Sequence, residues 1–352
     1  MLGASMNDIF LRACRREPVS RTPVWYMRQA GRYQKEYREL RKHHGILEIC
    51  RTPELAADVT RLPVRQLGVD AAILFSDIMV PVAAVGVPVR IEEGVGPIVD
   101  EPIRRAADVA RLRPLEPESD LPFVLECVRG LAGDLDVPLI GFAGGPFTLA
   151  SYLVEGGPSK SFVRTKSLMY SDPTTWRALM RQLADSVLAY LRAQVEAGAA
   201  AIQLFDSWIG VLSPDDYTFH VLPYVRSIFA GLAELGVPMI HFGVGTGELL
   251  KAMRDAGAGV IGVDWRVRLD RAWERVGSDA AIQGNLDPAA LLAPWEVVER
   301  KAMQVLAHAG GRPGHVFNLG HGVLPGTDPD ALRQLTELVH ERTTVPAAEA
   351  SS

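Results

Sequence analysis

Short apolar runs alternate along this chain with longer segments of helical periodicity. Each run has the length and composition of a strand that is buried on both faces. We count eight runs, which are Pro23–Met27, Ala71–Phe75, Pro138–Phe142, Ala200–Leu204, Pro238–Phe242, Gly259–Val263, Ala280–Gln283 and His315–Leu319. Several of the amphipathic segments between them begin with Asp or Ser followed by Pro, which favours a helix start. The main predicted helices are Pro53–Gln66, Asp172–Ala197, Pro214–Leu235, Pro288–Ala309 and Pro329–His340.

Parallel strands require helical crossovers of this kind. Eight strand and helix units in succession therefore predict an α/β fold, a single-domain (β/α)8 TIM barrel over residues 1–342. Residues Val82–Ile103 are rich in Val, Gly and Pro and interrupt the second unit, so we expect a β-hairpin insertion after strand 2, beside the rim of the barrel. We expect the small and polar residues 343–352 to form a disordered tail.

Composition and charge exclude several classes of protein. Of 352 residues, 48% are hydrophobic and 22% are charged, which excludes a disordered or fibrous chain. The 37 Lys and Arg against 42 Asp and Glu give a net charge of -5, so no overall positive field would attract nucleic acid or an anionic membrane. A polyanionic ligand would need a local basic patch.

The cysteines and the N-terminal sequence bear on the compartment. Cys14, Cys50 and Cys127 are widely spaced and odd in number, which is typical of a reducing cytoplasm. The first residues, MLGASMNDIF, lack the basic and apolar regions of a signal peptide, and no apolar run reaches the roughly 18 residues of a membrane span. We therefore expect a cytoplasmic protein that neither enters nor binds a membrane.

Polar and glycine-rich residues follow each apolar run, where a barrel of this kind places its chemistry. Asp77 follows the second run, Asp206 and Ser207 follow the fourth, and His321 follows the last, while Tyr152 lies just beyond the Gly144-Gly145-Pro146 turn. Each of these residues could be structural, since Ser207 could cap a helix and a lone histidine is more often structural than catalytic. Their coincidence on one rim favours a site.

The basic patch lies at the N-terminus. Residues 1–52 hold eleven Lys and Arg and five Asp and Glu, a local balance of 11 − 5 = +6. Arg28 and Arg32 are four residues apart, so in a helix they would share one face, either as a solvated face or as a site for an anion. Asp77 could cap a helix or pair with an arginine, or it could accept ligand N–H groups and stabilise positive charge; we expect the basic surroundings to keep it ionised.

Common cofactor and metal motifs do not occur. Gly243-Val244-Gly245-Thr246-Gly247 is not the dinucleotide pattern, and there is no phosphate-binding loop or nucleophile elbow. His43-His44 have no cysteine or carboxylate at ligand spacing, so a metal site has little support.

The motifs together resemble the uroporphyrinogen decarboxylase family, in its bacterial form. The matching segments follow the family's order and are Met27–Tyr33 (MRQAGRY), Phe75–Ile78 (FSDI), Gly141–Leu149 (GFAGGPFTL), Tyr152–Gly157 (YLVEGG), Phe205–Trp208 (FDSW) and Asn318–Gly322 (NLGHG). This resemblance implies a homodimeric enzyme of porphyrin and haem biosynthesis that removes the four acetate carboxyls of uroporphyrinogen III, giving coproporphyrinogen III, without a metal or organic cofactor.

The resemblance also implies roles for individual residues. Arg28, Gln29 and Arg32 would hold substrate carboxylates, with the backbone of Ala30 and Gly31 in the same loop. Asp77 would lie under the macrocycle, accept its pyrrole N–H groups and stabilise the reacting ring. The remaining contacts would come from Tyr152, Ser207 and His321. The proton donor stays open among Arg28, Tyr152, His321 and a held water.

Two other functions compete with this interpretation. The same superfamily resembles zinc-dependent methyltransferases that act on corrinoids or thiols and carry a His-x-Cys pair after a late strand. The corresponding stretch here is His241-Phe242-Gly243, which has no thiol. The second alternative is a tetrapyrrole-binding protein without catalysis, for which the same fold would serve.

Overall fold

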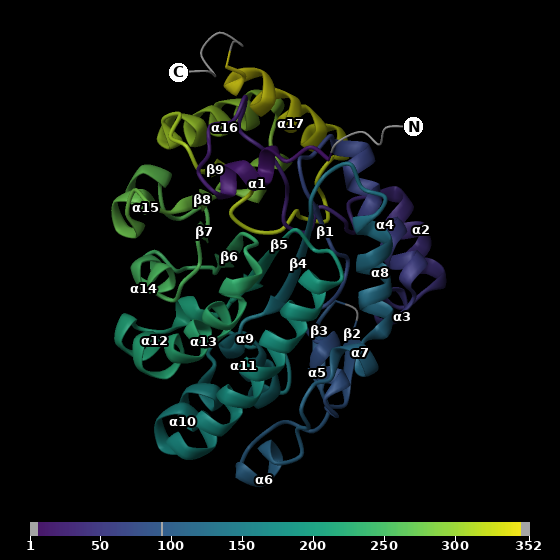
Figure 1. Ribbon diagram of the computed structural model, residues 1–352, viewed down its shortest axis with the longest axis vertical. Helices are drawn as coiled ribbons and strands as arrows, with labels where there is room; N and C mark the ends of the chain where they lie inside the picture. The colour runs from purple at the N-terminus through teal and green to yellow at the C-terminus, as the bar shows by residue number, and fades with distance from the viewer. Residues whose placement is uncertain (1–5, 93, 346–352) are drawn as a thin grey trace.

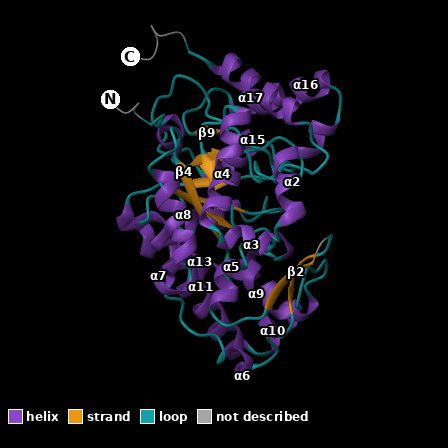
Figure 2. Ribbon diagram, turned by 90° about the vertical axis from the view of Figure 1, so that its right-hand side faces the viewer, coloured by secondary structure: helices purple, strands orange, loops and turns teal. Residues whose placement is uncertain are grey.

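A computed structural model describes residues 6–92 and 94–345. Seven strands form one parallel sheet in the order β1-β4-β5-β6-β7-β8-β9, and helices surround it (Figures 1 and 2). The strands are β1 (Ala72–Ile73), β4 (Leu139–Gly144), β5 (Ala201–Phe205), β6 (Met239–Phe242), β7 (Val260–Gly262), β8 (Ala281–Gln283) and β9 (His315–Val316). Each lies within or overlaps a predicted apolar run, which confirms the predicted fold class.

The first run, Pro23–Met27, fills the eighth position without becoming a regular strand. Val24 forms an isolated parallel bridge with Phe317, just beyond β9. On its other side, the Val24 carbonyl accepts the Asp70 N–H at 2.7 Å, which leads into β1. A longer ladder is prevented because Pro23 has no N–H and the Val24 N–H donates to the Asp70 carboxylate at 2.8 Å. Pro23–Met27 therefore closes the barrel between its last and first strands.

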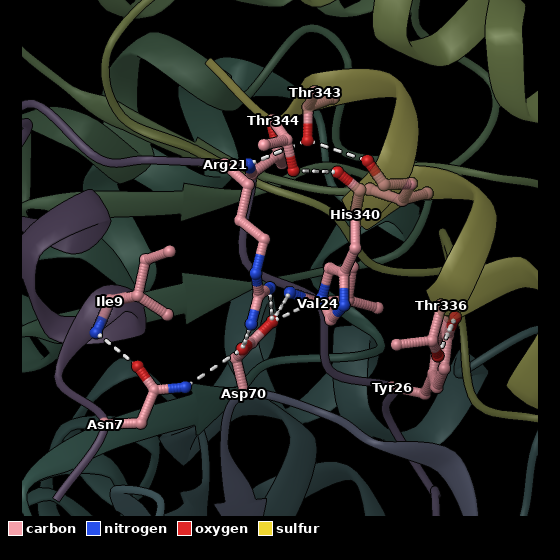
Figure 3. A network of polar contacts seen from close by, with 12 residues as sticks. Asn7, Ile9, Arg21, Val24, Tyr26, Asp70, Thr336, His340, Thr343 and Thr344 are labelled. Carbon is pink, nitrogen blue, oxygen red and sulfur yellow. Dashed lines mark hydrogen bonds and ion pairs between the residues drawn. The ribbon is translucent and has the colours of Figure 1, made fainter. Parts of the chain in front are cut away.

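A buried network around Asp70 holds this closure (Figure 3). Arg21 donates through both terminal nitrogens to the Asp70 carboxylate, at 2.7 and 2.8 Å. Nε2 of His340, on the C-terminal helix, lies 2.7 Å from Oδ2 of Asp70. Burial raises the pKa of Asp70, but the hydrogen bonds of His340 and Arg21 outweigh it, so the pKa is lowered overall. The network joins the N-terminal segment, β1 and the last helix.

The predicted helices are present, and two of them are divided into shorter helices. They appear as α4 (Pro53–Leu67), α11 (Pro173–Glu196), α12 (Pro214–His220) with α13 (Leu222–Leu232), η3 (Pro288–Leu292) with α16 (Trp295–Ala309), and α17 (Pro329–Thr343). The side chains of Asp172 and Ser213 accept the N–H groups of Thr175 and Asp216, so they cap α11 and α12 as the Asp-Pro and Ser-Pro pairs predicted.

The other helices are shorter. They are α1 (Ile9–Cys14), α2 (Lys35–His43), α3 (Ile46–Arg51), α5 (Val80–Ala84), α6 (Ala106–Val109), α7 (Pro117–Asp120), α8 (Pro122–Ala132), α9 (Pro146–Glu155), α10 (Val163–Ser171), η1 (Ile209–Val211), η2 (Ala233–Leu235), α14 (Leu250–Asp255) and α15 (Leu269–Val276). In the part of the chain that is described, no helix is long and apolar enough to cross a membrane.

The insertion after the second run contains a hairpin, as predicted. Strands β2 (Val89–Glu92) and β3 (Gly96–Val99) pair antiparallel, with Val89 opposite Val99. The predicted start at Val82 is wrong, because Val80–Ala84 forms the short helix α5. The hairpin docks beside α9 (Figure 2): the Val99 N–H donates to the Gly156 carbonyl at 3.0 Å.

The predicted tail starts inside the ordered body. Thr343 is the last residue of α17, and the Val345 N–H donates to the Ser20 carbonyl at 2.8 Å. The remainder of the predicted tail, residues 346–352, lies outside the described residues.

Candidate active site

The predicted site residues gather at one end of the barrel. Arg28 follows the closing run, Asp77 follows β1, Ser207 follows β5 and His321 follows β9, while Tyr152 lies on α9 directly after β4. Because the strands are parallel, these positions share the C-terminal rim. We call Arg28, Asp77, Tyr152 and His321 the rim cluster.

The two carboxylate oxygens of Asp77 have different surroundings. Oδ1 accepts the N–H of Met79 at 2.8 Å, and the Asp77 carbonyl accepts the N–H of Val80 at 3.0 Å. These bonds hold the turn that leads into α5. The N-cap of that helix is Met79 and no side chain caps it, so Asp77 holds the preceding turn and does not take the helix-capping role weighed from sequence. Among the described residues, Oδ2 has no hydrogen bond, and no cation pairs with the carboxylate within 4.0 Å. One oxygen fixes the loop, and the other stays available to a ligand.

Burial dominates the electrostatics of Asp77. It raises the pKa of the carboxyl, while the Met79 hydrogen bond and the charge of Arg28 oppose the rise without cancelling it. The charge of Arg28 favours the ionised form, as we expected of the basic surroundings, but burial has the larger effect on the pKa. Arg21, from the same basic stretch, is paired with Asp70 instead.

Arg28 is held in an unusual backbone conformation. Its φ is +57°, and the non-glycine residues with positive φ in the described chain are Arg16, Arg28 and Phe162. A residue in this region is strained by about 1 kcal/mol or more, which its surroundings must offset. The Arg28 side chain packs on Gly322, where an added Cβ would lie 2.7 Å from Arg28 Cγ.

The Arg28 guanidinium is exposed and makes no hydrogen bond or ion pair with the described residues. Its charge nevertheless influences the pKa of Asp77, Tyr152 and His321. These shared effects place the four residues of the rim cluster in one electrostatic neighbourhood.

Arg32 is also exposed, but it does not share a helix face with Arg28. Residues 28–34 form turns and bends, and α2 begins only at Lys35. The helical spacing considered for the two arginines is therefore incorrect. The two side chains can still bind separate anionic groups, because they extend from different turns of the loop.

Gln29 does not present its side chain to the rim. The side chain is fully buried: Oε1 accepts the N–H of Tyr26 at 3.1 Å, and Nε2 donates to the Ala71 carbonyl at 3.1 Å. It ties the arginine loop to β1, which corrects the predicted carboxylate-binding role of this side chain. Ala30 and Gly31 are partly exposed, and the Gly31 N–H is used by Gln34 Oε1 at 3.0 Å.

Tyr152 belongs to an aromatic group that the sequence did not reveal. Its ring centroid lies 4.1 Å from that of Trp208, and the ring centroid of Phe162 lies 5.0 Å from that of Trp208. Burial raises the pKa of Tyr152 to about 12, and the charge of Asp77 adds to the rise while Arg28 opposes it. Tyr152 is therefore a protonated hydroxyl at neutral pH.

Within the pair Asp206-Ser207, the two side chains differ in role. Asp206 is fully buried, and its Oδ1 accepts the Thr148 hydroxyl at 2.8 Å, near the start of α9. Ser207 is half-buried, and its hydroxyl has no hydrogen bond to the described residues. Ser207 is thus the member of the pair that is available to a ligand.

His321 is neutral and has a defined tautomer. Its Nδ1 accepts the N–H of Gly322 at 2.8 Å, which leaves Nε2 as the protonated nitrogen. Burial lowers the pKa of His321 to about 4; the charges of Arg28 and Arg266 add to this effect, and Asp264 opposes it. His321 can therefore donate a hydrogen bond from Nε2.

Arg266 is a rim residue that sequence reasoning missed. Its guanidinium lies 4.0 Å from the ring centroid of Trp265, and its Nη1 is 2.6 Å from Oδ2 of Asp264. Its position could have indicated it, because Asp264-Trp265-Arg266 directly follows an apolar run.

Metal ligands do not identify this rim in the part of the chain that is described. Across residues 6–92 and 94–345, no group of three His, Cys, Asp or Glu is arranged to hold a metal ion. Two shallow hollows of about 540 and 370 Å³ lie on the helical exterior, near Trp295 and Trp273 respectively, and contain no residue of the rim cluster. The rim cluster, by contrast, holds a free carboxylate oxygen and groups with shifted pKa values, which are more typical of an active site.

Comparison with known proteins agrees with the resemblance found in the sequence. The family model described as uroporphyrinogen decarboxylase matches residues 5–342. A uroporphyrinogen decarboxylase of Salinispora tropica is 58% identical over 98% of this chain and 93% of its own length. That of Sorangium cellulosum is 59% identical over 95% of this chain and 96% of its own.

Solved structures confirm the fold alone, because their sequence identity is low. A methyltransferase from Methanosarcina mazei superposes with a TM-score of 0.76 at 21% identity, covering 96% of this chain and 99% of that one. The family match, by contrast, extends over nearly the whole sequence at high identity. This chain therefore belongs to the uroporphyrinogen decarboxylase family.

Proposed function

We propose that this protein decarboxylates the four acetate side chains of uroporphyrinogen III to methyl groups, giving coproporphyrinogen III in haem biosynthesis. The family relationship supports the reaction class. The structural observation that carries the proposal is the free Oδ2 of Asp77, which lies on the same rim of the barrel as Arg28, Tyr152 and His321.

The reaction needs a sink for electrons and a way to stabilise positive charge. A proton first adds to the pyrrole carbon next to the one that bears the acetate, and the ring becomes cationic. The bond to the carboxylate then breaks, its electron pair neutralises the ring as an exocyclic methylene, and CO2 leaves. The methylene takes a proton to become a methyl, and the ring carbon loses the proton that it gained. In sum, one proton replaces one CO2.

Asp77 is the group that stabilises the cationic ring. Two opposite charges about 4 Å apart attract by about 4 kcal/mol at an effective dielectric of about 20. The carboxylate is held before the reaction by the Met79 N–H on Oδ1, so Oδ2 can face the pyrrole N–H groups without reorganisation. The pKa of Asp77, which is raised in the free enzyme, would fall again as the ring becomes positive.

Arg28 and Arg32 bind and orient the carboxylate arms, so that one acetate at a time reaches the reacting position. The His321 Nε2–H and the Tyr152 hydroxyl are the groups placed to donate hydrogen bonds to the substrate. We favour a water or an acid held by His321 and Tyr152 as the donor of the proton that starts the reaction. Arg28 is less suited, because its guanidinium is a very weak acid.

We further propose a homodimer that works in the cytoplasm, as the resemblance implies. The chain's three cysteines, which are unpaired thiols in the structure, agree with a reducing compartment. Light scattering of the purified protein tests the oligomeric state, where a mass of two chains is expected and a single-chain mass contradicts the dimer.

The decisive experiment is anaerobic incubation of chelator-treated protein with uroporphyrinogen III, followed by oxidation and mass analysis of the porphyrins. Stepwise loss of four carboxyls is expected. Unchanged substrate together with measured binding would favour the non-catalytic alternative. Loss of activity on chelation, restored by zinc, would instead favour the metal-dependent methyltransferase alternative.

A further inference from the structure

The loop after β7 is fixed at the rim by a buried carboxylate. Asp264 is 1% exposed, and its Oδ2 accepts the N–H of Gly245 and Nη1 of Arg266, both at 2.6 Å. Its Oδ1 accepts the backbone N–H of Arg266 at 3.1 Å. The carboxylate therefore holds both the backbone and the side chain of Arg266 and joins them to the loop after β6.

Two further contacts tie this loop to its other neighbours. Nδ2 of Asn285, after β8, donates to the carbonyls of Asp264 at 2.8 Å and Val267 at 2.5 Å. Gly320, after β9, packs so closely on the backbone of Trp265 that an added Cβ would collide with it. A residue presented from such a loop loses little conformational entropy when it binds a ligand.

The Arg266 guanidinium has free donors next to the rim cluster. It stacks 4.0 Å above the Trp265 ring, and the edge-on His321 ring lies 6.3 Å from the same indole. Half of the Arg266 side chain is exposed. Nη1 donates to Asp264, while Nε and Nη2 have no acceptor among the described residues. These two nitrogens form one edge of the guanidinium fork, which matches the two oxygens of a carboxylate.

We propose that Arg266 is a specificity-determining residue that binds a carboxylate arm of the tetrapyrrole. This inference rests on the proposed function for the identity of the ligand. His321 follows β9. Arg28 follows the closing run on one side of that strand, Arg266 follows β7 two strands away on the other side, and both of their charges act on the His321 ring. A polyanionic ligand complements both charges by placing a carboxylate near each guanidinium. Arg266 thereby adds a third guanidinium to those of Arg28 and Arg32 for binding the carboxylates of the ligand.

The alternative is that Arg266 only completes the Asp264 loop. The variants Arg266→Ala and Arg266→Lys distinguish the two roles, since lysine keeps the charge but loses the planar fork. Arg268→Ala is the matched control, because Arg268 is two residues further on, exposed, and paired with Asp270 at 2.7 Å instead of facing His321.

The test measures binding of uroporphyrin and coproporphyrin, the stable oxidised forms of substrate and product, by fluorescence titration at several salt concentrations. We expect Arg266→Ala to raise the Kd for uroporphyrin about five- to tenfold and to flatten its salt dependence, with the lysine variant between it and the wild type. Arg268→Ala should match the wild type. If Arg266→Ala weakens the binding of uroporphyrin alone, Arg266 binds an acetate. If it weakens the binding of coproporphyrin equally, Arg266 binds a propionate.

The inference is overturned if Arg266→Ala and the wild type have equal Kd values, or if Arg268→Ala weakens binding as much. Failure of the wild type to bind uroporphyrin would overturn it as well. This readout does not depend on turnover. Binding lost in Arg266→Ala while the wild type releases no CO2 would refute the proposed decarboxylation alone.

Discussion

The most informative single substitution is Asp77→Asn. It removes the negative charge and keeps the size and planarity of the side chain. The amide oxygen of asparagine can still accept the Met79 N–H that Oδ1 accepts at 2.8 Å, so the turn before α5 should persist. The substitution therefore separates the loop-holding role of Oδ1 from the charge that Oδ2 offers to a ligand.

The expected size of the effect follows from the charge that is lost. An attraction of about 4 kcal/mol at about 4 Å corresponds to a factor of about 10³ in rate, and some of it is retained through the amide dipole. We therefore expect kcat to fall about 10²- to 10³-fold. The effect on KM should be small, because the arginines bind the carboxylates in both the ground state and the transition state.

The stability of Asp77→Asn, in contrast to its kcat, should not fall. Burial raises the pKa of Asp77 in the folded protein, so the unfolded chain releases this proton more readily. The ionised carboxyl thus destabilises the fold at neutral pH, and this cost disappears as the pH falls below the pKa of the unfolded chain, which is near 3.8 for a free aspartate. Asp77→Asn should raise or preserve the melting temperature, as is common for residues kept for function.

The assay is anaerobic turnover of uroporphyrinogen III with a thermal unfolding scan on the same samples. In the wild type, kcat/KM should decline as the pH falls through the raised pKa of Asp77, and this acid limb should be absent from the residual activity of Asp77→Asn. Wild-type turnover by a folded Asp77→Asn protein would refute the role of the charge. A variant with a strongly lowered melting temperature would show that we have misjudged the role of Oδ1.

Three further substitutions test the barrel closure and the other residues of the rim. Asp70→Asn should lower the free energy of unfolding by about 3 kcal/mol in denaturant titrations near neutral pH, because it leaves the partly buried guanidinium of Arg21 without its anionic partner; since the pKa of Asp70 is lowered, this stabilisation is lost from the wild type as the pH falls below about 4, and an unchanged unfolding midpoint would contradict it. Gly322→Ala should displace Arg28 and raise KM several-fold in steady-state kinetics without unfolding the protein, whereas Gly326→Ala, which meets its nearest atom at an ordinary 3.6 Å, should be neutral; equal KM values would contradict this. His321→Ala should lower kcat about tenfold, less than the Asp77 variant, because it removes one hydrogen-bond donor; a loss as large as that of the Asp77 variant would reverse the assignment of roles.

The barrel was predictable from sequence because its strands are buried on both faces, so apolar runs mark them directly. One apolar run does not form a regular strand, and the reason cannot be found in the local sequence pattern. Pro23–Met27 is as apolar as the other runs, yet the Asp70 carboxylate takes the Val24 N–H that a ladder would use. That competition involves a residue 46 positions away along the chain, which no local pattern reveals.

The candidate site was predictable in its location and less so in its electrostatics. Following the strands to their C-terminal ends placed Asp77, Tyr152 and His321 on one rim. A charge count along the sequence could not reveal which arginines approach Asp77, and Arg21 is paired elsewhere. Likewise, Gln29 belongs to the motif of the arginine loop, but the structure uses its amide to fasten that loop to β1.

The most direct test of the account is a crystal structure of the protein with coproporphyrinogen bound under anaerobic conditions. We predict that the macrocycle lies on the rim cluster, with pyrrole nitrogens at about 2.7–3.2 Å from Oδ2 of Asp77 and Oδ1 still bonded to Met79. A macrocycle bound away from this rim, or an Asp77 carboxylate turned from the pyrrole nitrogens toward a protein cation, would contradict the central claim.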